Sequence, residues 1–493
     1  MAIELEERAA VSVPELVAGL PEIYQPIYGH PEFSSQVARH CDDRLAVIEQ
    51  AWRVLGQALG RPPRVLDMGC AQGYVSLRLA ELGAEVIGID HFQENIAVCQ
   101  ALAAEHPELR VSFLAANLER LFDYLDMSKV DLVLGLSVVH HMAAAHGHEA
   151  ITQWIGGLGK QVAACIFELA LAQEPVHWAP ALPADERDLL SGFAFVHELS
   201  RIPTHLSTIM RPMYFASNFL WQLDNQVDLF RSMTRSSHTH SGETCGGSRR
   251  YFFQGERLAK VYSLRDKFPR LNAAEILNEV AFLSKPPPGF MPLPQLHAWG
   301  VREDREAWLV RDSLPGELLY DCILADKPYN VTSIIRDVLK QLVVLEERGL
   351  YHNDIKPWNV LLLPDGTATL IDYGSISPHK EAFSWPQQLF SSFWLFVWCI
   401  ATKSQWSGQT FAPPFASPYN LPEPYLGWAR IFWALPVPSW SFQLLLSTFD
   451  VAMAGLVSNE ALNAQEVWRR NVECYLAELS QAVSTLYATS ATA

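Results

Sequence analysis

The sequence has no excess of positive charge and no pattern that would send the chain into a membrane. Its 493 residues hold 37 Lys and Arg against 54 Asp and Glu, a formal net charge of −17. The phosphate backbone of nucleic acids repels such a chain, which argues against nucleic-acid binding through a basic surface. Residues 1–8 are acidic and lack the basic and apolar regions of a signal peptide.

Long apolar runs and paired cysteines are also missing. The longest apolar run, residues 390–401, includes two serines and is too short to span a bilayer, so it predicts a buried helix. The eight cysteines are scattered, with no C-x-x-C pair and no spacing typical of zinc. They indicate reduced thiols in a cytoplasmic protein.

Apolar side chains are plentiful and suffice for more than one core. They make up 49% of the residues, and 493 residues exceed the length of one ordinary domain. Two or three domains are therefore expected. The apolar spacing from Leu45 to Leu59 predicts a helix within a helical region over residues 1–60, and residues 465–485 predict another helix.

A polar loop between two apolar runs carries the strongest functional signal. Residues 351–359 read Y-H-N-D-I-K-P-W-N, and a D-Y-G motif begins at Asp372, thirteen residues after Asn359. This order and spacing are typical of protein kinases. In that pattern Asp354 would orient the acceptor hydroxyl and Lys356 would contact the transferred phosphoryl group. Asn359 and Asp372 would hold the Mg²⁺ ions that bridge the ATP phosphates. A merely structural turn is the alternative, and the spacing argues against it.

The sequence upstream of this loop supports the kinase interpretation. Lys260 stands in an A-K-V strand, where a kinase lysine pairs the ATP phosphates, and Glu279 follows within the helical run 273–283. An ordinary surface ion pair is the alternative. Arg311 and Leu314 fall in a strand and connection that match the adenine-binding hinge.

The region before this strand changes in composition to Ser, Thr, His and Gly over residues 231–248. It predicts either a linker between domains or a flexible flap over the ATP phosphates, in which Gly242, Gly246 and Gly247 would supply the flexibility.

The first half of the chain carries a strand–turn–helix signal. Residues 64–73 read R-V-L-D-M-G-C-A-Q-G, with Asp67, Gly69 and Gly73 at the turn, and a second strand ends on Asp90. Glycines at such a turn let the backbone approach a ligand, and an acid that ends the second strand can bind ribose hydroxyls. This describes a site for a nucleoside-type cofactor, and a purely structural βαβ unit is the alternative.

The pattern D-x-G-x-x-x-G, followed by V-x-G-I-D, resembles a class I S-adenosylmethionine methyltransferase, with Ala71 in place of the usual middle glycine. Strand-like runs over residues 131–137 and 162–169 continue the alternating order of a doubly wound sheet. The resemblance implies that Asn117, Leu118 and Glu119 lie near the adenine and that Leu136 borders the methionine end.

Two histidines follow the strand that ends near residue 137. His140 and His141 should lie beside the methyl donor, at the carboxyl ends of the strands. There they could bind an anionic acceptor or act as a base, or they could be ordinary surface histidines. Arg201, His205 and Arg211 could form a pocket for a phosphate or sugar, or could be solvated loop charges.

A methyltransferase that precedes a kinase resembles the WbdD-type bifunctional enzymes that terminate bacterial O-antigen polysaccharides. The resemblance extends along nearly the whole chain and is carried by these segments: L-P-E-I-Y-Q at 20–25, G-H-P-E at 29–32, V-L-D-M-G-C-A-Q-G at 65–73, G-I-D at 88–90, Q-E-N-I at 93–96, G-L-S-V-V-H-H at 135–141, R-P-M-Y at 211–214, S-R-R-Y-F-F at 248–253, and H-N-D and P-W-N at 352–354 and 357–359.

The resemblance implies that the kinase phosphorylates the non-reducing terminal mannose of a lipid-linked glycan with ATP and that the phosphate is then methylated, which stops elongation. It implies a polymerase or glycosyltransferase partner, self-association, and a cytoplasmic location peripheral to the inner membrane. It adds these contacts to S-adenosylmethionine: Tyr24, Gln25, Arg44, Gln93, Glu94, Asn95 and Ile96.

The expected architecture is α/β plus α+β. A Rossmann-like methyltransferase domain over residues 1–215 precedes a bilobal kinase-like domain over 216–460 and a C-terminal helix and tail over 461–493. A regulatory protein kinase with a vestigial methyltransferase fold is the main alternative. A non-catalytic scaffold would lack Lys260, Asp354 or Asp372, and the chain has all three.

Overall fold

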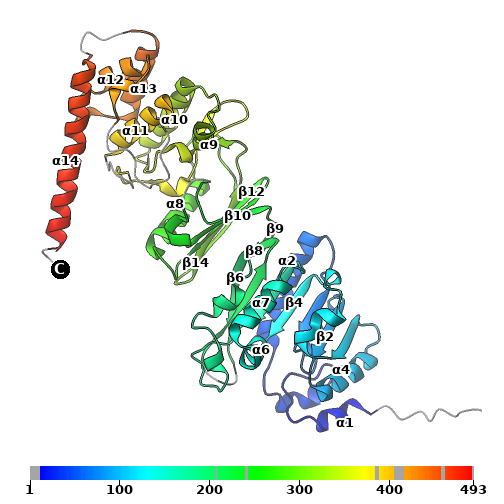
Figure 1. Cartoon of the computed structure of the whole chain (residues 1–493). Coiled ribbons are helices and arrows are strands. Elements are labelled where there is room, and N and C mark those ends of the chain that lie inside the picture. The colour runs from blue at the N-terminus through cyan, green and yellow to red at the C-terminus, as the bar shows by residue number, and fades with distance from the viewer. Residues whose placement is uncertain are drawn as a thin grey trace, which may run out of the picture. The chain divides into compact units, whose positions relative to one another are not determined.

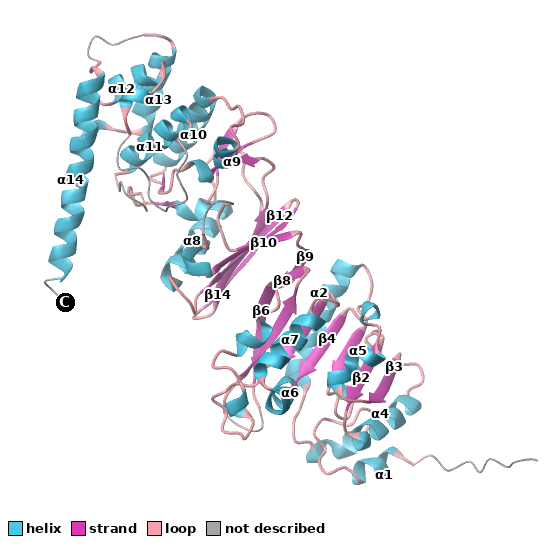
Figure 2. Ribbon diagram, viewed as in Figure 1, coloured by secondary structure: helices cyan, strands magenta, loops and turns pink. Residues whose placement is uncertain are grey.

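The computed structural model describes residues 11–204, 206, 208–238, 242–382, 388–404, 416–456 and 461–490. The chain divides into two compact units, residues 1–231 and 232–493. The first unit is an α/β domain and the second has a small sheet-rich lobe and a larger helical lobe, as the sequence predicts (Figures 1 and 2).

The first unit is organised around a seven-stranded sheet with the order β3-β2-β1-β4-β5-β7-β6. The first five of these strands are parallel, β7 is antiparallel to β5, and β6 is antiparallel to β7. The sheet strands are β1 (Val65–Met68), β2 (Val86–Asp90), β3 (Val111–Ala115), β4 (Leu132–Leu136), β5 (Ala164–Glu168), β6 (Phe195–Ile202) and β7 (Arg211–Ser217), and a hairpin of β8 (Leu220–Leu223) and β9 (Gln226–Leu229) follows.

Helices cover both faces of this sheet. One face packs against residues of α6 and α7, and the other against residues of α1, α3 and α4. The central strands β1, β4 and β5 are buried along their whole length, which explains their continuous apolar sequences. The helices are α1 (Val13–Ala18), α2 (Asp42–Leu59), α3 (Tyr74–Glu81), α4 (Gln93–Glu105), α5 (Leu121–Tyr124), α6 (Val139–His146) and α7 (His148–Leu158).

One sequence expectation for this unit needs correction. The described part of residues 1–60 is helical only in α1, α2 and a 3₁₀ turn at Pro31–Gln36, because Pro21, Pro26 and Pro31 interrupt the stretch between the two helices. The region after Pro175, where the sequence shows no clear pattern, contributes β6 and β7 to the sheet.

The second unit begins with a five-stranded antiparallel sheet in the order β10-β11-β12-β14-β13, against which α8 packs. The chain between β10 and β11 therefore joins two neighbouring strands of one sheet, as a flap does. The elements are β10 (Ser232–Thr234), β11 (Arg249–Gln254), β12 (Arg257–Ser263), α8 (Pro269–Ser284), β13 (Leu296–Arg302) and β14 (Glu306–Asp312).

The larger lobe has an aromatic-rich core between α10, α11, α12 and α13. Trp394, for example, stacks on Phe432 with ring centroids 5.6 Å apart. The elements are β15 (Glu317–Leu318), α9 (Leu319–Leu324), α10 (Val331–Glu346), β16 (Tyr351–His352), β17 (Val360–Leu362), β18 (Ala368–Leu370), β19 (Ile376–Ser377), α11 (Leu389–Thr402), α12 (Tyr425–Phe432), α13 (Phe442–Met453) and α14 (Ala464–Ser490).

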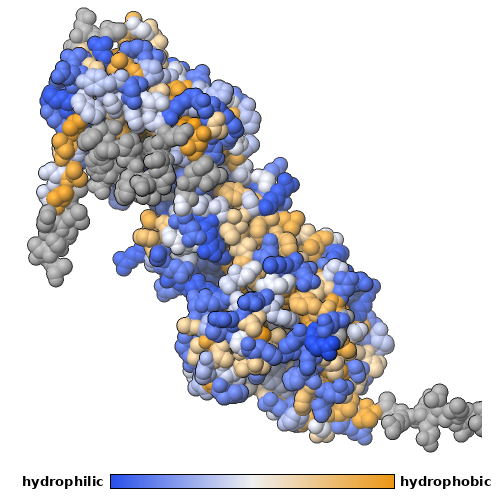
Figure 3. Space-filling model, in the orientation of Figure 1, coloured by the Kyte–Doolittle hydropathy of each residue, from blue (hydrophilic) through white to orange (hydrophobic). Residues whose placement is uncertain are grey.

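Most apolar side chains of α11 are buried, as the sequence predicts. No helix within the described ranges combines the length and the hydropathy needed to cross a bilayer. On the visible face, hydrophilic and hydrophobic residues are interspersed, and orange patches follow α14, where Leu476 and Leu479 are exposed (Figure 3).

Candidate active sites

A cavity of about 1000 Å³ in the first unit lies at the carboxyl ends of its parallel strands. Gly69 follows β1, Asp90 ends β2 and Leu136 ends β4, and all three line the cavity. The sheet order reverses between β1 and β4, so their following connections leave in opposite directions and open a crevice. The cavity is thus at the position where this fold class binds its ligands.

Backbone groups fix the Asp90 carboxylate at the wall of this cavity. Its Oδ2 accepts the Ala71 N–H at 2.9 Å and its Oδ1 accepts the Phe92 N–H at 2.8 Å. Gly69 has a φ of +71°, and a Cβ there would lie 3.0 Å from the Val138 side chain. Ala71 also adopts a positive φ, +48°, a conformation that costs a non-glycine residue about 1–2 kcal/mol. The turn thus tolerates local strain where its backbone holds Asp90.

The structure brings most of the expected cofactor residues to this one cavity. Beyond those already described, the following expected residues line it: Tyr24, Asn95, Asn117, Leu118, Glu119, His140, His141 and, from the phosphate-pocket set, Arg211. Segments from five different parts of the first unit therefore meet where the sequence places S-adenosylmethionine.

Other expected residues stand behind the cavity wall. Gln25 accepts the Tyr74 N–H at 3.1 Å, and buried Asp67 accepts the Ser76 hydroxyl at 2.6 Å. Burial raises the pKa of Asp67 to about 6. The other residues that the sequence predicts to bind S-adenosylmethionine and that do not line the cavity are Arg44, Gly73, Gln93, Glu94 and Ile96.

A buried cluster of charges borders the cavity, and most of its members are not marked in the sequence. Glu168, at the end of β5, pairs with Arg39 at 2.8 Å and with Arg44 at 3.4 Å. Arg211 lies 3.7 Å from Glu168 and pairs with Glu174 at 2.7 Å. Three buried arginines face two buried glutamates, so the cluster keeps one positive charge.

Arg39 connects this cluster to the cavity wall. Its Nη1 donates to the Ser137 hydroxyl at 2.8 Å and to the Tyr24 hydroxyl at 3.2 Å, and both acceptors line the cavity. Of the expected acceptor-binding set, Arg211 lines the cavity, whereas Arg201 pairs with Glu198 at 3.1 Å and His205 lies outside the described residues. Positive charge at the cavity comes from Arg211 and the Arg39 network.

His140 and His141 line the cavity without adding charge to it. Burial and the nearby cationic groups of His141, Arg211 and Arg39 hold the pKa of His140 at about 2. Burial and Arg211 also lower the pKa of His141. Neutral His140 packs against the Trp178 ring at 4.2 Å. It is too weak a base at neutral pH to deprotonate an alcohol, and it does not attract anions by charge.

The second unit presents the ion pair that kinases use to hold ATP. The Lys260 Nζ lies 2.6 Å from Glu279 Oε2 and 3.8 Å from Asp372 Oδ1. Arg311 donates to the other Glu279 oxygen at 2.7 Å, so this expected hinge residue is buried against α8. Leu314 lies in the connection between β14 and β15 and is half-buried.

The catalytic loop has the hydrogen bonds that its motif predicts. Asn359 Nδ2 donates to Asp354 Oδ2 at 2.8 Å, and His352 Nε2 bonds the Ile371 carbonyl at 2.8 Å, which ties the loop to the strand before Asp372. Burial raises the pKa of Asp354, opposed by Lys356. A raised pKa suits a carboxylate that accepts a proton during transfer. Lys356 itself donates to Ser392 on α11 at 2.9 Å.

Asn359 and Asp372 fit a magnesium site completed by phosphates. Both offer oxygen atoms, and the Asn359 amide nitrogen bonds Asp354, which leaves its oxygen directed elsewhere. Burial would raise the pKa of Asp372, but Lys260 and the Ser375 hydroxyl outweigh it and lower the pKa. Among the described residues no three His, Cys, Asp or Glu side chains converge on one point. Mg²⁺ needs few protein ligands when a nucleotide supplies the others.

Three aromatic rings lie beside the catalytic loop. His238 of the flap stacks on Trp358 with centroids 5.0 Å apart, and Tyr320 of α9 meets the edge of Trp358 at 5.6 Å. Trp358 stands in the loop between Asp354 and Asn359. Trp358 and His238 are half-buried and Tyr320 is buried, so the first two rings offer an apolar face beside the catalytic loop.

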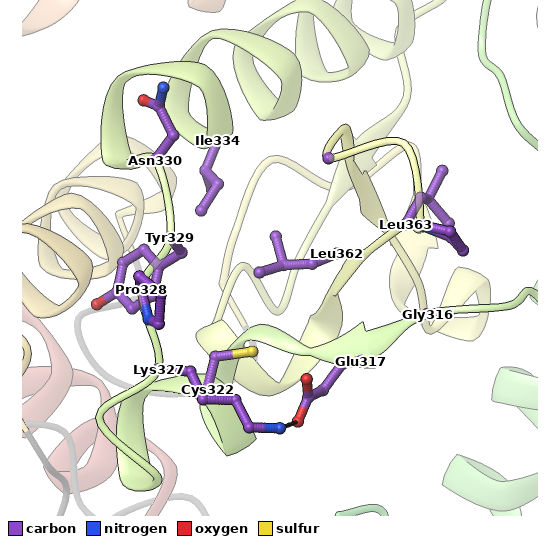
Figure 4. A pocket seen from close by; sticks show the side chains of 12 residues that line it. Gly316, Glu317, Cys322, Lys327, Pro328, Tyr329, Asn330, Ile334, Leu362 and Leu363 are labelled. Carbon is purple, nitrogen blue, oxygen red and sulfur yellow. Dashed lines mark hydrogen bonds and ion pairs between the residues drawn. The ribbon is translucent and has the colours of Figure 1, made fainter.

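The second unit has a cavity of about 580 Å³ between the α9–α10 connection and the β17–β18 hairpin (Figure 4). Tyr329, Asn330 and Leu362 are among its lining residues, and a Lys327–Glu317 ion pair stands at its side. None of the expected nucleotide or metal residues lines it.

The fold and the two sites define a methyltransferase fused to a kinase. A family model described as a methyltransferase domain matches residues 65–158. Two curated relatives from Escherichia coli are both described as the O-antigen chain terminator bifunctional methyltransferase/kinase WbdD. The first is 38% identical over 94% of this chain and 66% of its own length. The second is 37% identical over 95% of this chain and 67% of its own length. A solved structure of the bifunctional kinase-methyltransferase WbdD is 36% identical, with a TM-score of 0.82 over 94% of this chain and 99% of that chain.

The chain belongs to the WbdD family of bifunctional methyltransferase/kinases. The match confirms the resemblance read from the sequence, and it implies S-adenosylmethionine as methyl donor and ATP as phosphoryl donor. The chain spans about two thirds of the length of these curated relatives.

The fixed position of Asp90 generates a prediction about the methyl donor. Asp90→Ala should weaken S-adenosylmethionine binding roughly 10- to 100-fold, since a hydrogen bond to a charged group contributes about 1.5–3 kcal/mol. Isothermal calorimetry measures this directly. Glu85→Ala, at the opposite end of β2, is the control and should bind normally. Unchanged affinity in Asp90→Ala would place the donor elsewhere.

The catalytic loop predicts separate roles for two acids. Asp354→Asn should bind ATP nearly normally and lower turnover about 10²- to 10⁴-fold, because proton transfer loses its base. Asp372→Ala should lose metal-dependent ATP binding as well. Nucleotide titrations with and without Mg²⁺, beside turnover assays, separate the two effects. Asp365→Asn, in the exposed β17–β18 turn, is the control, and normal turnover by either test variant would contradict the assignment.

Proposed function

We propose that the chain phosphorylates the non-reducing terminal sugar of an O-antigen-type polysaccharide with ATP and then methylates that phosphate with S-adenosylmethionine, which ends elongation. One observation carries the proposal. A chain that matches O-antigen chain terminators over 94% of its length joins a kinase catalytic loop to a methyl-donor cavity bordered by a buried arginine cluster. Mannose is the proposed sugar, by the resemblance to the family.

The surroundings of Asp354 support a sugar hydroxyl as phosphoryl acceptor. The rings of Trp358, Tyr320 and His238 form a small aromatic group beside the catalytic acid. The C–H face of a pyranose ring can pack on such a group while its hydroxyls stay exposed to polar partners. Asp354 and Lys356 would then act on the acceptor hydroxyl and the transferred phosphoryl group, and Asn359 and Asp372 would hold Mg²⁺.

The charges of the first unit support a phosphate as methyl acceptor. A sugar hydroxyl would need a strong base beside the sulfonium methyl group, and His140, with a pKa of about 2, is not one. A phosphate monoester is already anionic and needs no base. Arg211, on the cavity wall, offers positive charge to a phosphate oxygen while it stays bonded to Glu174, and the Arg39 network adds to the positive potential.

The proposal includes the place of the reaction and its partners. A lipid-linked polysaccharide acceptor would bring the enzyme to the cytoplasmic face of the inner membrane, beside the glycosyltransferase that extends the same chain. Incubation with ATP, S-adenosylmethionine and short mannosides, followed by mass spectrometry, tests the acceptor. Gains of one phosphate and then one methyl group are the expected products.

The order of the two reactions is the next prediction. Asp354→Asn should fail to methylate an unmodified mannoside, because no phosphate is made, and should methylate a chemically phosphorylated one at the wild-type rate. Mass spectrometry of both substrates gives the comparison. Methylation of the unphosphorylated mannoside without ATP would show a methyl ether product and contradict the proposal.

The acceptor also predicts how methyl transfer depends on pH. With phosphorylated mannoside, the rate should rise with pH and level off near neutrality, since the second pKa of a phosphate monoester is about 6 and Arg211 favours the dianion. His140 is neutral above a pH of about 2, so His140→Asn should leave the midpoint of this rise unchanged. A rise near pH 6.5 that disappears in His140→Asn would instead make this histidine the base.

A further inference from the structure

A buried Arg–Glu pair in the second unit takes no part in the chemistry described above. Arg249 is the first residue of β11, directly after the flap, and its Nη1 lies 2.5 Å from Glu275 Oε2 on α8. The guanidinium also donates from Nε to Asn272 Oδ1 at 2.9 Å and covers the Tyr262 ring at 4.7 Å. Arg249 is therefore held on three sides.

Asn272 extends the same connection to the base of the flap. Its Nδ2 donates to the Ser248 hydroxyl at 3.0 Å and to the Ser263 carbonyl at 2.8 Å, and the residue is fully buried. The first turns of α8 thus hold both the end of the flap and the end of the neighbouring strand β12.

Glu275 also brings α8 against the D-Y-G motif. A Cβ on Gly374 would lie 2.8 Å from the Glu275 carbonyl oxygen, so only glycine allows this approach. Asn278 Nδ2 donates to the Gly374 carbonyl at 3.2 Å. The helix therefore contacts the metal-binding segment within two residues of Asp372.

The spacing of these residues places them on one face of α8. Asn272, Glu275 and Glu279 follow each other at intervals of three and four residues, which are neighbours on a helical surface. This face bonds in turn to the flap base, to Arg249 and to Lys260. A shift of the helix at one of these points changes the geometry at the others.

We propose that Arg249 and Glu275 are a positioning pair for phosphoryl transfer, through which the base of the flap sets the position of Glu279 and Lys260 at the ATP phosphates. The inference rests on the kinase function proposed above. Neither residue needs to touch the nucleotide, because the pair acts through α8.

Charge-matched variants test the pair in the full-length chain. Glu275→Gln keeps the shape of the side chain and removes its charge, and it should lower kcat for phosphoryl transfer about 10- to 100-fold, since a small displacement of a catalytic group has effects of this size. The KM for ATP should change much less. Arg249→Glu and Glu275→Arg should each be at least as impaired, and the double variant Arg249→Glu/Glu275→Arg should recover part of the lost kcat.

Three controls keep the outcome interpretable. Arg250→Met removes the neighbouring arginine, and Glu256→Gln changes an exposed acid in the β11–β12 turn, so both should behave as wild type. Methyl transfer by the same variants, together with circular dichroism, confirms that the chain is folded. The rate of basal ATP hydrolysis can be compared between variant and wild type even if mannosides prove not to be the acceptor. This comparison separates failure of this inference from failure of the proposed function.

Wild-type kcat in Glu275→Gln would overturn the proposal. A second result would also overturn it: the double variant has a kcat no higher than that of the single reversals, and calorimetry with ADP and Mg²⁺ shows a matching loss of nucleotide affinity. That result would make Arg249 a direct phosphate ligand.

Discussion

In each unit, a buried carboxylate held between two cations fixes the geometry on which the rest of the site depends. Glu168 lies between Arg39 and Arg44, and Glu279 lies between Lys260 and Arg311. Burial of a charge without a partner is expensive, so each carboxylate requires its cations, and each cation is confined to one position. Since the second cation remains when the first engages a substrate, the carboxylate stays paired throughout a reaction cycle. This arrangement lets Lys260 turn toward phosphate without leaving Glu279 as an isolated charge, because Arg311 remains paired with it.

The two sites complement each other electrostatically. The proposed kinase reaction adds negative charge to a neutral sugar, and the buried cluster beside the cavity of the first unit has one surplus positive charge, with neutral His140 at the cavity wall. A neutral glycan end would find no base there, whereas a phosphorylated end would find Arg211. Under this proposal the order of the two reactions arises from charge, and no signal between the units is required for the second reaction to wait for the first.

The sequence predicts those parts of the fold and sites that depend on short-range patterns. Residues 351–359 lie in one loop whose hydrogen bonds the motif itself defines, and the glycine turn before Asp90 is a local βα unit, so both are visible in the sequence. Arg39 and Glu168 are 129 residues apart and meet only because β5 ends beside the segment before α2. Strand β7 was missed because burial along its whole length removes the alternation that marks a strand. Strand β6, at the sheet edge, mixes buried and half-buried residues without strict alternation. The sequence left open whether His140 binds an anion, acts as a base or is an ordinary surface histidine, because its burial depends on packing against Trp178.

The position of β7 gives the first unit a late step in its assembly. This strand lies between β5 and β6, although it follows both in the chain. The edge of β5 therefore stays unpaired while the ribosome adds residues 169–217, for roughly 2–10 seconds at 5–20 residues per second. An open edge of this kind is a template for wrong pairing, and the chain must tolerate it on every round of synthesis. Arg211 is the first residue of β7, so the last strand of the sheet in chain order also brings an arginine of the cavity wall. A nascent chain can therefore form the glycine turn before Asp90 well before Arg211 is in place.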